Sequence, residues 1–284
     1  MADYKCFDVA IENHIAHIQL TRPEKRNSMI PEFWTELPAI VAEIDQQAQA
    51  RVIVISSTGP HFTAGLDIQA FFNQAASDAD SSDPKAHLAK GAKFYAQVKD
   101  LQDSFSILEQ CRIPVLVAIQ GGCIGGGIDM VTACDMRYAT ADAFFILQET
   151  NIGMTADVGT FPRLPKLIPE GIARELAYTG RRFEVAEAQR IGLVNAVFDD
   201  AETMVAAVMQ IAAEIASKAP LAIAGCKRII NYARDHSTAD TLDYIRIWNA
   251  SHLQTDEIIE AIGANAEQRE AQFAQLPKKS PFAS

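Results

Sequence analysis

Short apolar runs alternate along most of the chain with segments whose apolar residues recur at helical spacing. Residues 7–20 alternate between apolar and polar positions, as half-buried strands do. The continuous apolar runs at 51–57 and 114–121 are typical of strands that are covered on both faces, and 136–149 also has the pattern of strands. Strands that alternate with helices in this way predict parallel βα units and an α/β fold.

Two helices are predicted in the first half of the chain. One opens at Pro31 and runs to about residue 47, with a kink expected at Pro38. Residues 73–85 are small, polar and acidic and predict a loop, and a long helix follows that ends near Cys111. The apolar stripe of this second helix is formed by Phe94, Val98, Leu101, Phe105 and Leu108.

The last part of the chain has a different pattern, because residues 201–276 are nearly all helical. This segment has no strands of its own to cover, so its apolar faces must pack on the main body or on another subunit. We therefore divide the chain into a core, 1–200, and a helical C-terminal region, 201–284, with an expected role in oligomer formation.

Composition narrows the possible partners. The 284 residues carry a formal net charge of -11, which argues against nucleic acid as the main partner but leaves room for a phosphate-bearing ligand on a local basic patch. Neither a secretory signal, nor a run near the ~20 apolar residues of a membrane span, nor an SKL ending is apparent. We expect a cytoplasmic protein. The five cysteines are irregularly spaced without a CxxC pair, which predicts reduced, mostly buried thiols and no bound metal.

Two segments share one design that suits the binding of an oxyanion. The buried strand at 51–57 leads to HFTAGLD (61–67), and the strand at 114–121 leads to GGCIGGGID (121–129) with a helix after it. Backbone N–H groups from two such loops can converge on one oxygen, and a helix N-terminus adds unpaired donors. The alternative is a pair of tight turns that require glycine.

Familiar nucleotide and hydrolase motifs are absent from the sequence. Neither G-x-G-x-x-G nor the P-loop pattern can be drawn through the glycines, and neither G-x-S-x-G nor H-E-x-x-H occurs. No cofactor is therefore expected.

Three carboxylates lie in apolar or glycine-rich surroundings. Asp129 follows the glycines, Glu149 ends the segment FFILQE, and Asp157 lies in GMTADVGT. Such groups are candidates for a raised pKa and for acid–base catalysis. Each also has a structural alternative: a charge favoured by the helix dipole for Asp129, a solvated strand end for Glu149 and a turn residue for Asp157.

These stretches together resemble the crotonase, or enoyl-CoA hydratase/isomerase, superfamily over almost the whole chain. HFTAGLD and GGCIGGGID are similar to its two oxyanion-hole segments, and RPEKRNSM and TGRRFEVAEAQRIGLVNAVF (179–198) to other common stretches. The resemblance implies a crotonase-like spiral of ββα units with a helical C-terminal region, assembled as a homotrimer or homohexamer. It implies that the N–H groups of Ala64 and Gly126 hold a thioester carbonyl. It also implies that Gly65, Leu66 and Asp67 bind an acyl-CoA substrate, of which coenzyme A is a part.

Within the superfamily the carboxylates indicate one subfamily. Hydratases carry glutamates where this chain has Asp129 and Glu149, and a glycine in place of Asp157. The set Asp129, Glu149 and Asp157 resembles the pattern of the Δ3,5-Δ2,4-dienoyl-CoA isomerases of unsaturated fatty acid β-oxidation. The segment ADVGTFPRLPK (156–166) and the tail at 234–258 are also similar to this subfamily. The resemblance implies that Glu149 acts at C2 and Asp157 at C6 through a trienolate, or the reverse, with Asp129 as an auxiliary group.

Other functions stay open at this point. Hydration of a 2-enoyl-CoA and Δ3-Δ2 isomerisation are alternatives within the superfamily, and a non-catalytic acyl-CoA-binding protein is an alternative from another class. Lys25, Arg26 and Lys227 are candidates to contact the CoA phosphates.

Overall fold

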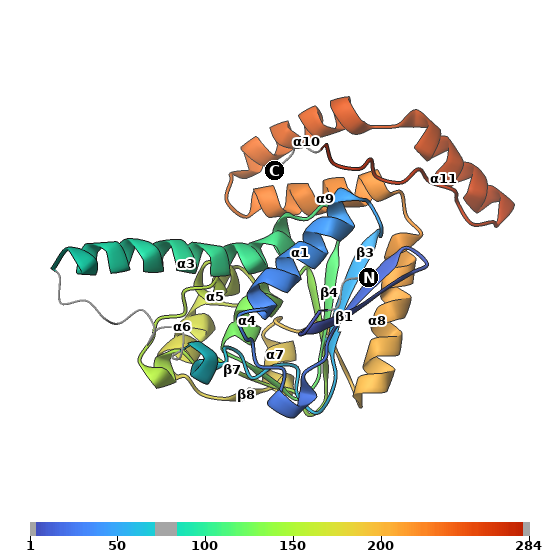
Figure 1. Cartoon of the computed structure of the whole chain (residues 1–284). Coiled ribbons are helices and arrows are strands. Elements are labelled where there is room, and N and C mark those ends of the chain that lie inside the picture. Colours follow the sequence, from blue (N-terminus) through green and yellow to red (C-terminus); the bar gives the residue numbers. More distant parts are fainter. Residues whose placement is uncertain (1–3, 72–83, 281–284) are drawn as a thin grey trace.

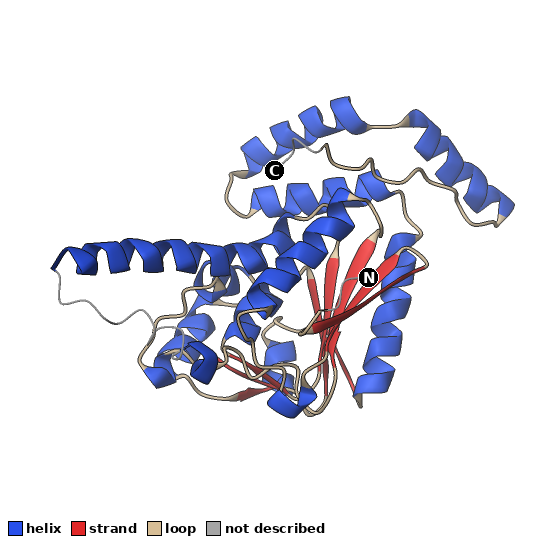
Figure 2. Cartoon of the chain, in the orientation of Figure 1, coloured by secondary structure: helices blue, strands red, loops and turns tan. Residues whose placement is uncertain are grey.

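The computed structural model describes residues 4–71 and 84–280, and a mixed sheet of six strands lies at its centre (Figure 2). The strand order is β1-β2-β3-β4-β6-β9. β1 and β2 form an antiparallel hairpin, and every later pairing in this sheet is parallel. The bounds are Phe7–Glu12 (β1), Ile15–Leu20 (β2), Val52–Ser57 (β3), Val115–Ile119 (β4), Met136–Thr140 (β6) and Ala196–Phe198 (β9).

The alternation of side chains divides the two central strands between two apolar layers. In β3, Ile53 and Ile55 belong to the larger core, whereas Val52 and Val54 belong to a smaller cluster on the opposite face. Both faces are therefore covered, as the continuous apolar runs predict. Helices α1 (Phe33–Gln46), α3 (Pro84–Gln110) and α4 (Gly126–Ala133) contribute to the larger core. Figure 1 shows α1 and α4 on the side of the sheet opposite α8.

The smaller cluster is completed by α8 (Ala201–Ala216). Its apolar side packs on β2, β3, β4 and β6 through residues that recur at helical spacing, namely Met204, Val208, Ala212 and Ala216. Within the helical region expected at 201–284, α8 therefore covers the sheet of its own chain, which is one of the two alternatives that the sequence leaves open. The helices after it are α9 (Pro220–Ala233), α10 (Thr238–His252) and α11 (Thr255–Glu267).

A second, three-stranded sheet lies beside the first. It contains β5 (Gly122–Ile124), β7 (Phe144–Ile146) and β8 (Phe183–Glu184), and β5 pairs in parallel with β7. The short helices α5 (Thr160–Arg163), α6 (Glu170–Thr179) and α7 (Val185–Arg190) lie between β7 and β9 in the chain. This arrangement leaves the loop at 147–159 between the small sheet and α5.

The two helices expected in the first half form with small differences. α1 starts at Phe33 and stays helical through Pro38, so the expected start at Pro31 is two residues early. The stripe of α3 is fully buried near its end, at Phe105 and Leu108, whereas Phe94 is half exposed. The predicted loop at 73–85 lies almost wholly outside the described residues.

The cysteines are free thiols. Four of the five are buried, and Cys226 is exposed. Among residues 4–71 and 84–280, no single helix has both the length and the hydropathy needed to cross a bilayer. The pair α8 and α9 reaches the required length and hydropathy only when the two helices are taken together, and a 107° bend separates them.

Candidate active site

The two glycine-containing loops lie side by side, as parallel pairing of β3 and β4 requires. Both strands end at the same edge of the sheet, and the loops after them are joined by an isolated bridge between Thr63 and Cys123. The N–H of Thr63 donates to the carbonyl of Gly122 at 3.1 Å, and the N–H of Ile124 donates to the carbonyl of Thr63 at 3.2 Å. The expected convergence of the two loops is therefore present.

Two backbone N–H groups in these loops remain available. Those of Leu66 and Gly126 donate to no acceptor within the described part of the chain. A Cβ placed on Gly126 would lie 3.9 Å from the Leu66 nitrogen, and one placed on Gly65 would lie 3.2 Å from the Gly126 nitrogen and 2.5 Å from the carbonyl oxygen of Ile124. Gly65 also has a φ of +79°, so glycine is needed here both for the turn and for the close approach of the loops. The pair has the arrangement of an oxyanion hole.

The expectation that Ala64 supplies the first of these donors is wrong. Its N–H is hydrogen-bonded to the carbonyl of Arg26 at 2.9 Å, so it is not free for a ligand. Leu66 takes its place, two residues further along the same loop. The Asp67 carboxylate is also occupied within the protein, since it accepts from the Ser28 hydroxyl at 2.9 Å and from the Ala70 N–H at 3.0 Å.

Asp129 lies in the first turn of α4 and is 1% exposed. One of its oxygens accepts two hydrogen bonds from Thr160, from the N–H at 2.6 Å and from the hydroxyl at 2.7 Å. Burial raises the pKa of Asp129 to about 6, against the lowering effect of these bonds. Asp129 thus has specific partners beyond the favourable helix dipole.

Glu149 precedes a short 3-10 turn at Thr150–Ile152 and does not end a solvated strand. It is half-buried, and a Cβ placed on Gly125 would lie 3.2 Å from its Oε1. The carboxylate therefore lies against the residue next to the Gly126 donor. Burial, followed by the charge of Asp129, raises the pKa of Glu149 to about 7.

Asp157 completes a group of three carboxyls. It is half-buried, burial raises its pKa, and its backbone carbonyl accepts from the Gln102 amide at 2.6 Å. The charge of Asp157 raises the pKa of both Asp129 and Glu149. The structure thus brings together the three carboxylates that the sequence singles out, beside the two free N–H groups.

Sequence reasoning missed the residues that hold this cluster in place. Thr160 and Arg163 lie at the two ends of α5, and Gln102 lies on α3, far from the cluster in sequence. The only local signal is that Thr160 follows Asp157 and Gly159 at the start of a helix, where a threonine is common.

Of the three candidates for contact with the CoA phosphates, two are exposed and one is buried. Lys25 and Arg26 are exposed on a turn near the oxyanion loops. Lys227 is 7% exposed, and its ammonium pairs with Asp135 at 2.9 Å and donates to the carbonyls of Leu108 and Ile113. Lys227 is therefore a buried structural residue, and the expectation that it contacts the CoA phosphates is wrong.

A protein-family model described as "Enoyl-CoA hydratase/isomerase" matches residues 10–277. The chain belongs to this family. A solved family structure, the enoyl-CoA hydratase from Bacillus anthracis, superposes with a TM-score of 0.84 at 28% identity and covers 95% of this chain and 99% of its own. The expected crotonase fold, with its helical C-terminal region, is therefore confirmed.

Two curated relatives are more similar in sequence. The mitochondrial Delta(3,5)-Delta(2,4)-dienoyl-CoA isomerase of Homo sapiens is 42% identical over 270 residues, which cover 94% of this chain and 80% of the relative. The peroxisomal Delta(3,5)-Delta(2,4)-dienoyl-CoA isomerase of Arabidopsis thaliana is 35% identical and covers 97% of this chain and 99% of its own length.

These relatives contradict the expected cytoplasmic location, since their names place them in mitochondria or peroxisomes. The prediction rested on the absence of recognisable address signals, and such an absence does not specify a compartment.

Proposed function

We propose that this protein converts a 3,5-dienoyl-CoA into the 2,4-dienoyl-CoA by moving a proton from C2 to C6. The observation that carries this proposal is the third carboxylate: Asp157 lies with Asp129 and Glu149 beside the free N–H groups of Leu66 and Gly126. The relatives named as isomerases of this substrate support it, as does the fatty acid metabolism of the family.

The proposed reaction begins at the thioester. The N–H groups of Leu66 and Gly126 donate to its carbonyl oxygen, which stabilises negative charge there. The ionised carboxylate of Glu149 removes a proton from C2, and the electron pair delocalises through both double bonds as a trienolate. The carboxyl of Asp157 then donates a proton at C6, and the double bonds move into conjugation with the thioester. The proton gained by Glu149 and lost by Asp157 is balanced by exchange within the cluster or with solvent.

The raised pKa values of the two groups suit this exchange. A general acid or base works best when its pKa lies near the working pH, and burial brings the pKa of Glu149 to about 7. Asp129 is 1% exposed and accepts two hydrogen bonds from Thr160, so in this proposal it acts through its charge on Glu149 and not by contact with the substrate.

Hydration is the less favoured chemistry at this site. A hydratase needs two carboxylates that hold a water molecule between them. Asp129 is 1% exposed and one of its oxygens already accepts two bonds from Thr160, so it is poorly placed to hold that water. A non-catalytic acyl-CoA-binding role would leave three carboxyls with raised pKa values unexplained.

The test is product analysis with a 3,5-dienoyl-CoA beside a 2-enoyl-CoA, followed by ultraviolet absorbance. Glu149→Gln should block exchange of the C2 proton with deuterated water. Asp157→Asn should retain C2 exchange but lose accumulation of the conjugated product, with losses of ~10²–10⁴ in rate. The surface variant Glu175→Gln is the matched control and should behave as wild type, because Glu175 is exposed and its ion pair is with Arg181, outside the cluster.

Each outcome has one interpretation. If the two variants exchange their behaviour, Asp157 acts at C2 and Glu149 at C6. If Asp157→Asn isomerises at the wild-type rate, Asp157 is a turn residue and the isomerase assignment fails. Turnover of the 2-enoyl-CoA alone would instead establish a hydratase.

We also propose that the chain assembles as a homotrimer or homohexamer through the helices after α9. Large apolar side chains on α10 and α11 are more than two-fifths exposed in the single chain, namely Leu242, Ile247, Ile258, Ile259 and Ile262. A second copy of the chain would cover them. A monomer in sedimentation at micromolar concentration would contradict this assembly.

A further inference from the structure

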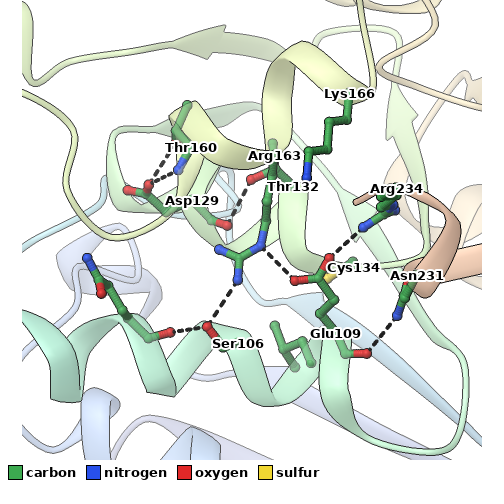
Figure 3. A network of polar contacts seen from close by, with 12 residues as sticks. Ser106, Glu109, Asp129, Thr132, Cys134, Thr160, Arg163, Lys166, Asn231 and Arg234 are labelled. Atoms are coloured by element: carbon green, nitrogen blue, oxygen red, sulfur yellow. Dashed lines mark hydrogen bonds and ion pairs between the residues drawn. The ribbon is translucent and has the colours of Figure 1, made fainter. Parts of the chain in front are cut away.

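Arg163, at the end of α5, joins the turn that carries Asp157 to the long helix α3. Its Nε pairs with Glu109 at 3.1 Å, and its Nη2 donates to the Ser106 hydroxyl at 3.0 Å (Figure 3). The side chain is only 11% exposed, so the ion pair is largely shielded from solvent.

The guanidinium also lies directly against the turn that follows Asp157. A Cβ placed on Gly159 would lie 1.9 Å from Nη1 of Arg163, and Gly159 has a φ of +139°. Glycine is therefore required twice at this position, for its backbone conformation and for contact with the guanidinium. The position of Arg163 consequently constrains the backbone two residues after Asp157.

The partner of Arg163 is itself fixed by a second helix. The other carboxylate oxygen of Glu109 pairs with Arg234 at 2.5 Å, and its backbone carbonyl accepts from the amide of Asn231 on α9 at 3.0 Å. Glu109 thus connects α5 to α3 and α9. At the opposite end of α5, Thr160 donates both of its hydrogen bonds to Asp129.

We propose that Arg163 is a positioning residue that holds the Asp157 carboxyl where it can protonate the distal end of the diene. This inference rests on the proposed function. The physical reason is that both ends of α5 are held: Thr160 ties one end to Asp129, and Arg163 ties the other end to α3 through Glu109 and Ser106.

Small displacements at such a site have large effects. A misplacement of about 1 Å in a reacting group costs on the order of 10²-fold in rate. Glu149 is fixed by a different segment, next to Gly125, so release of α5 should affect the two carboxyls unequally. This inequality separates a positioning role from a general loss of structure.

The central variant is Arg163→Gln, measured for isomerisation and for C2 exchange in deuterated water. We expect isomerisation to fall roughly 10- to 100-fold, while C2 exchange stays within about threefold of wild type. Arg163→Lys should recover part of the isomerisation, because a lysine keeps the charge for Glu109 but lacks the planar fork that reaches Ser106 and covers Gly159. Arg181→Gln, which breaks partly buried pairs with Glu187 and Glu175, is the matched control and should leave both rates unchanged.

A double-mutant cycle gives the decisive readout. If Arg163 acts through Asp157, adding Arg163→Gln to Asp157→Asn should change the remaining C2 exchange and isomerisation less than threefold. Equal losses of exchange and isomerisation in Arg163→Gln, or full additivity with Asp157→Asn, would overturn the positioning role. Should Arg163→Gln fail to fold by circular dichroism, Glu109→Gln tests the same link, and unequal or equal losses are interpreted in the same way.

Failure of the proposed function is recognised before any variant is made. A wild-type protein that does not isomerise a 3,5-dienoyl-CoA overturns the isomerase assignment and this inference together. A wild type that isomerises, with an Arg163→Gln variant that loses nothing, overturns only the role of Arg163.

Discussion

Replacement of Asp129 by asparagine tests the electrostatic state of the site most directly. Asp129 is 1% exposed, accepts two hydrogen bonds from Thr160 and forms no ion pair within the described residues. An asparagine has nearly the same shape and keeps an oxygen for both bonds, so Asp129→Asn removes the charge and little else.

The effect of the Asp129 charge on the free energy of unfolding follows from the pKa of this group. Burial raises the pKa of Asp129 from 3.8 to about 6, and a shift of roughly two units corresponds to roughly 3 kcal/mol. Because the folded-state pKa is the higher one, the folded protein binds this proton more tightly than the unfolded chain does. The ionised group therefore destabilises the fold above pH 6, and the effect fades as the pH falls from about 6 to 3.8.

Asp129→Asn should accordingly be more stable than wild type by about 1–3 kcal/mol at about pH 8, with the gain vanishing below about pH 4. Urea unfolding at several pH values and one protein concentration measures this difference. The matched control is Asp45→Asn, at an equally buried aspartate that pairs with Arg112 at 2.8 Å and with Lys279 at 2.6 Å. This control should lose stability at neutral pH, because the partly exposed Arg112 and Lys279 lose the buried carboxylate with which they pair.

The same variant should also change the pH dependence of catalysis. The Asp129 charge helps to raise the pKa of Glu149, so its removal lowers that pKa, while burial keeps it above the ordinary value. The acid limb of the pH–rate profile should move to lower pH, and the rate at neutral pH should fall because Glu149 becomes a weaker base. An Asp129→Asn protein that is destabilised equally at every pH, with an unmoved acid limb, would refute both the buried charge and its coupling to Glu149.

Two further variants test other parts of the structure. Gly126→Pro should lower turnover by ~10²–10³ with little change in circular dichroism, because proline suits the first position of a helix but has no N–H for the oxyanion; near-normal turnover would show that this donor is not used. Lys227→Met should lower the free energy of unfolding by about 3–5 kcal/mol in urea titrations, because Asp135 and two carbonyls lose a buried cation; a loss below about 1 kcal/mol would show that Lys227 is not a structural residue.

The parts of the fold predicted correctly are those set by local patterns. Residues 52–55 are apolar at every position because both faces of β3 are covered there, and the same holds for all of β4. The partner of α8 could not be chosen from the sequence for the opposite reason. Helical periodicity shows that Met204 and Val208 share one face, but not whether that face packs on the sheet of the same chain or on another subunit.

In the candidate active site, the sequence likewise identifies the correct loops but not the individual atoms that act. The glycines and carboxylates mark the correct loops, since few other reasons place Asp129 and Glu149 in apolar sequence. The choice between Ala64 and Leu66 as a donor depends on the carbonyl of Arg26, which approaches from a distant turn. Spacing alone cannot detect such a contact, and the position of Arg163 over Gly159 was hidden for the same reason.

Burial is the main cause of the raised pKa values of Asp129, Glu149 and Asp157, and the surrounding cations do not reverse it. Arg163 is the cation placed closest in the chain to Asp157, yet its guanidinium is paired with Glu109, which is shared with Arg234. Among the described residues, the three carboxyls of the cluster therefore keep no cation of their own within ion-pair distance. A free cation here would lower the pKa of Glu149 and leave it a weaker base. The Glu109 network thus supports the turn that carries Asp157, and the charge of the paired Arg163 lowers the pKa of Asp129 too little to overcome burial, which keeps that pKa at about 6.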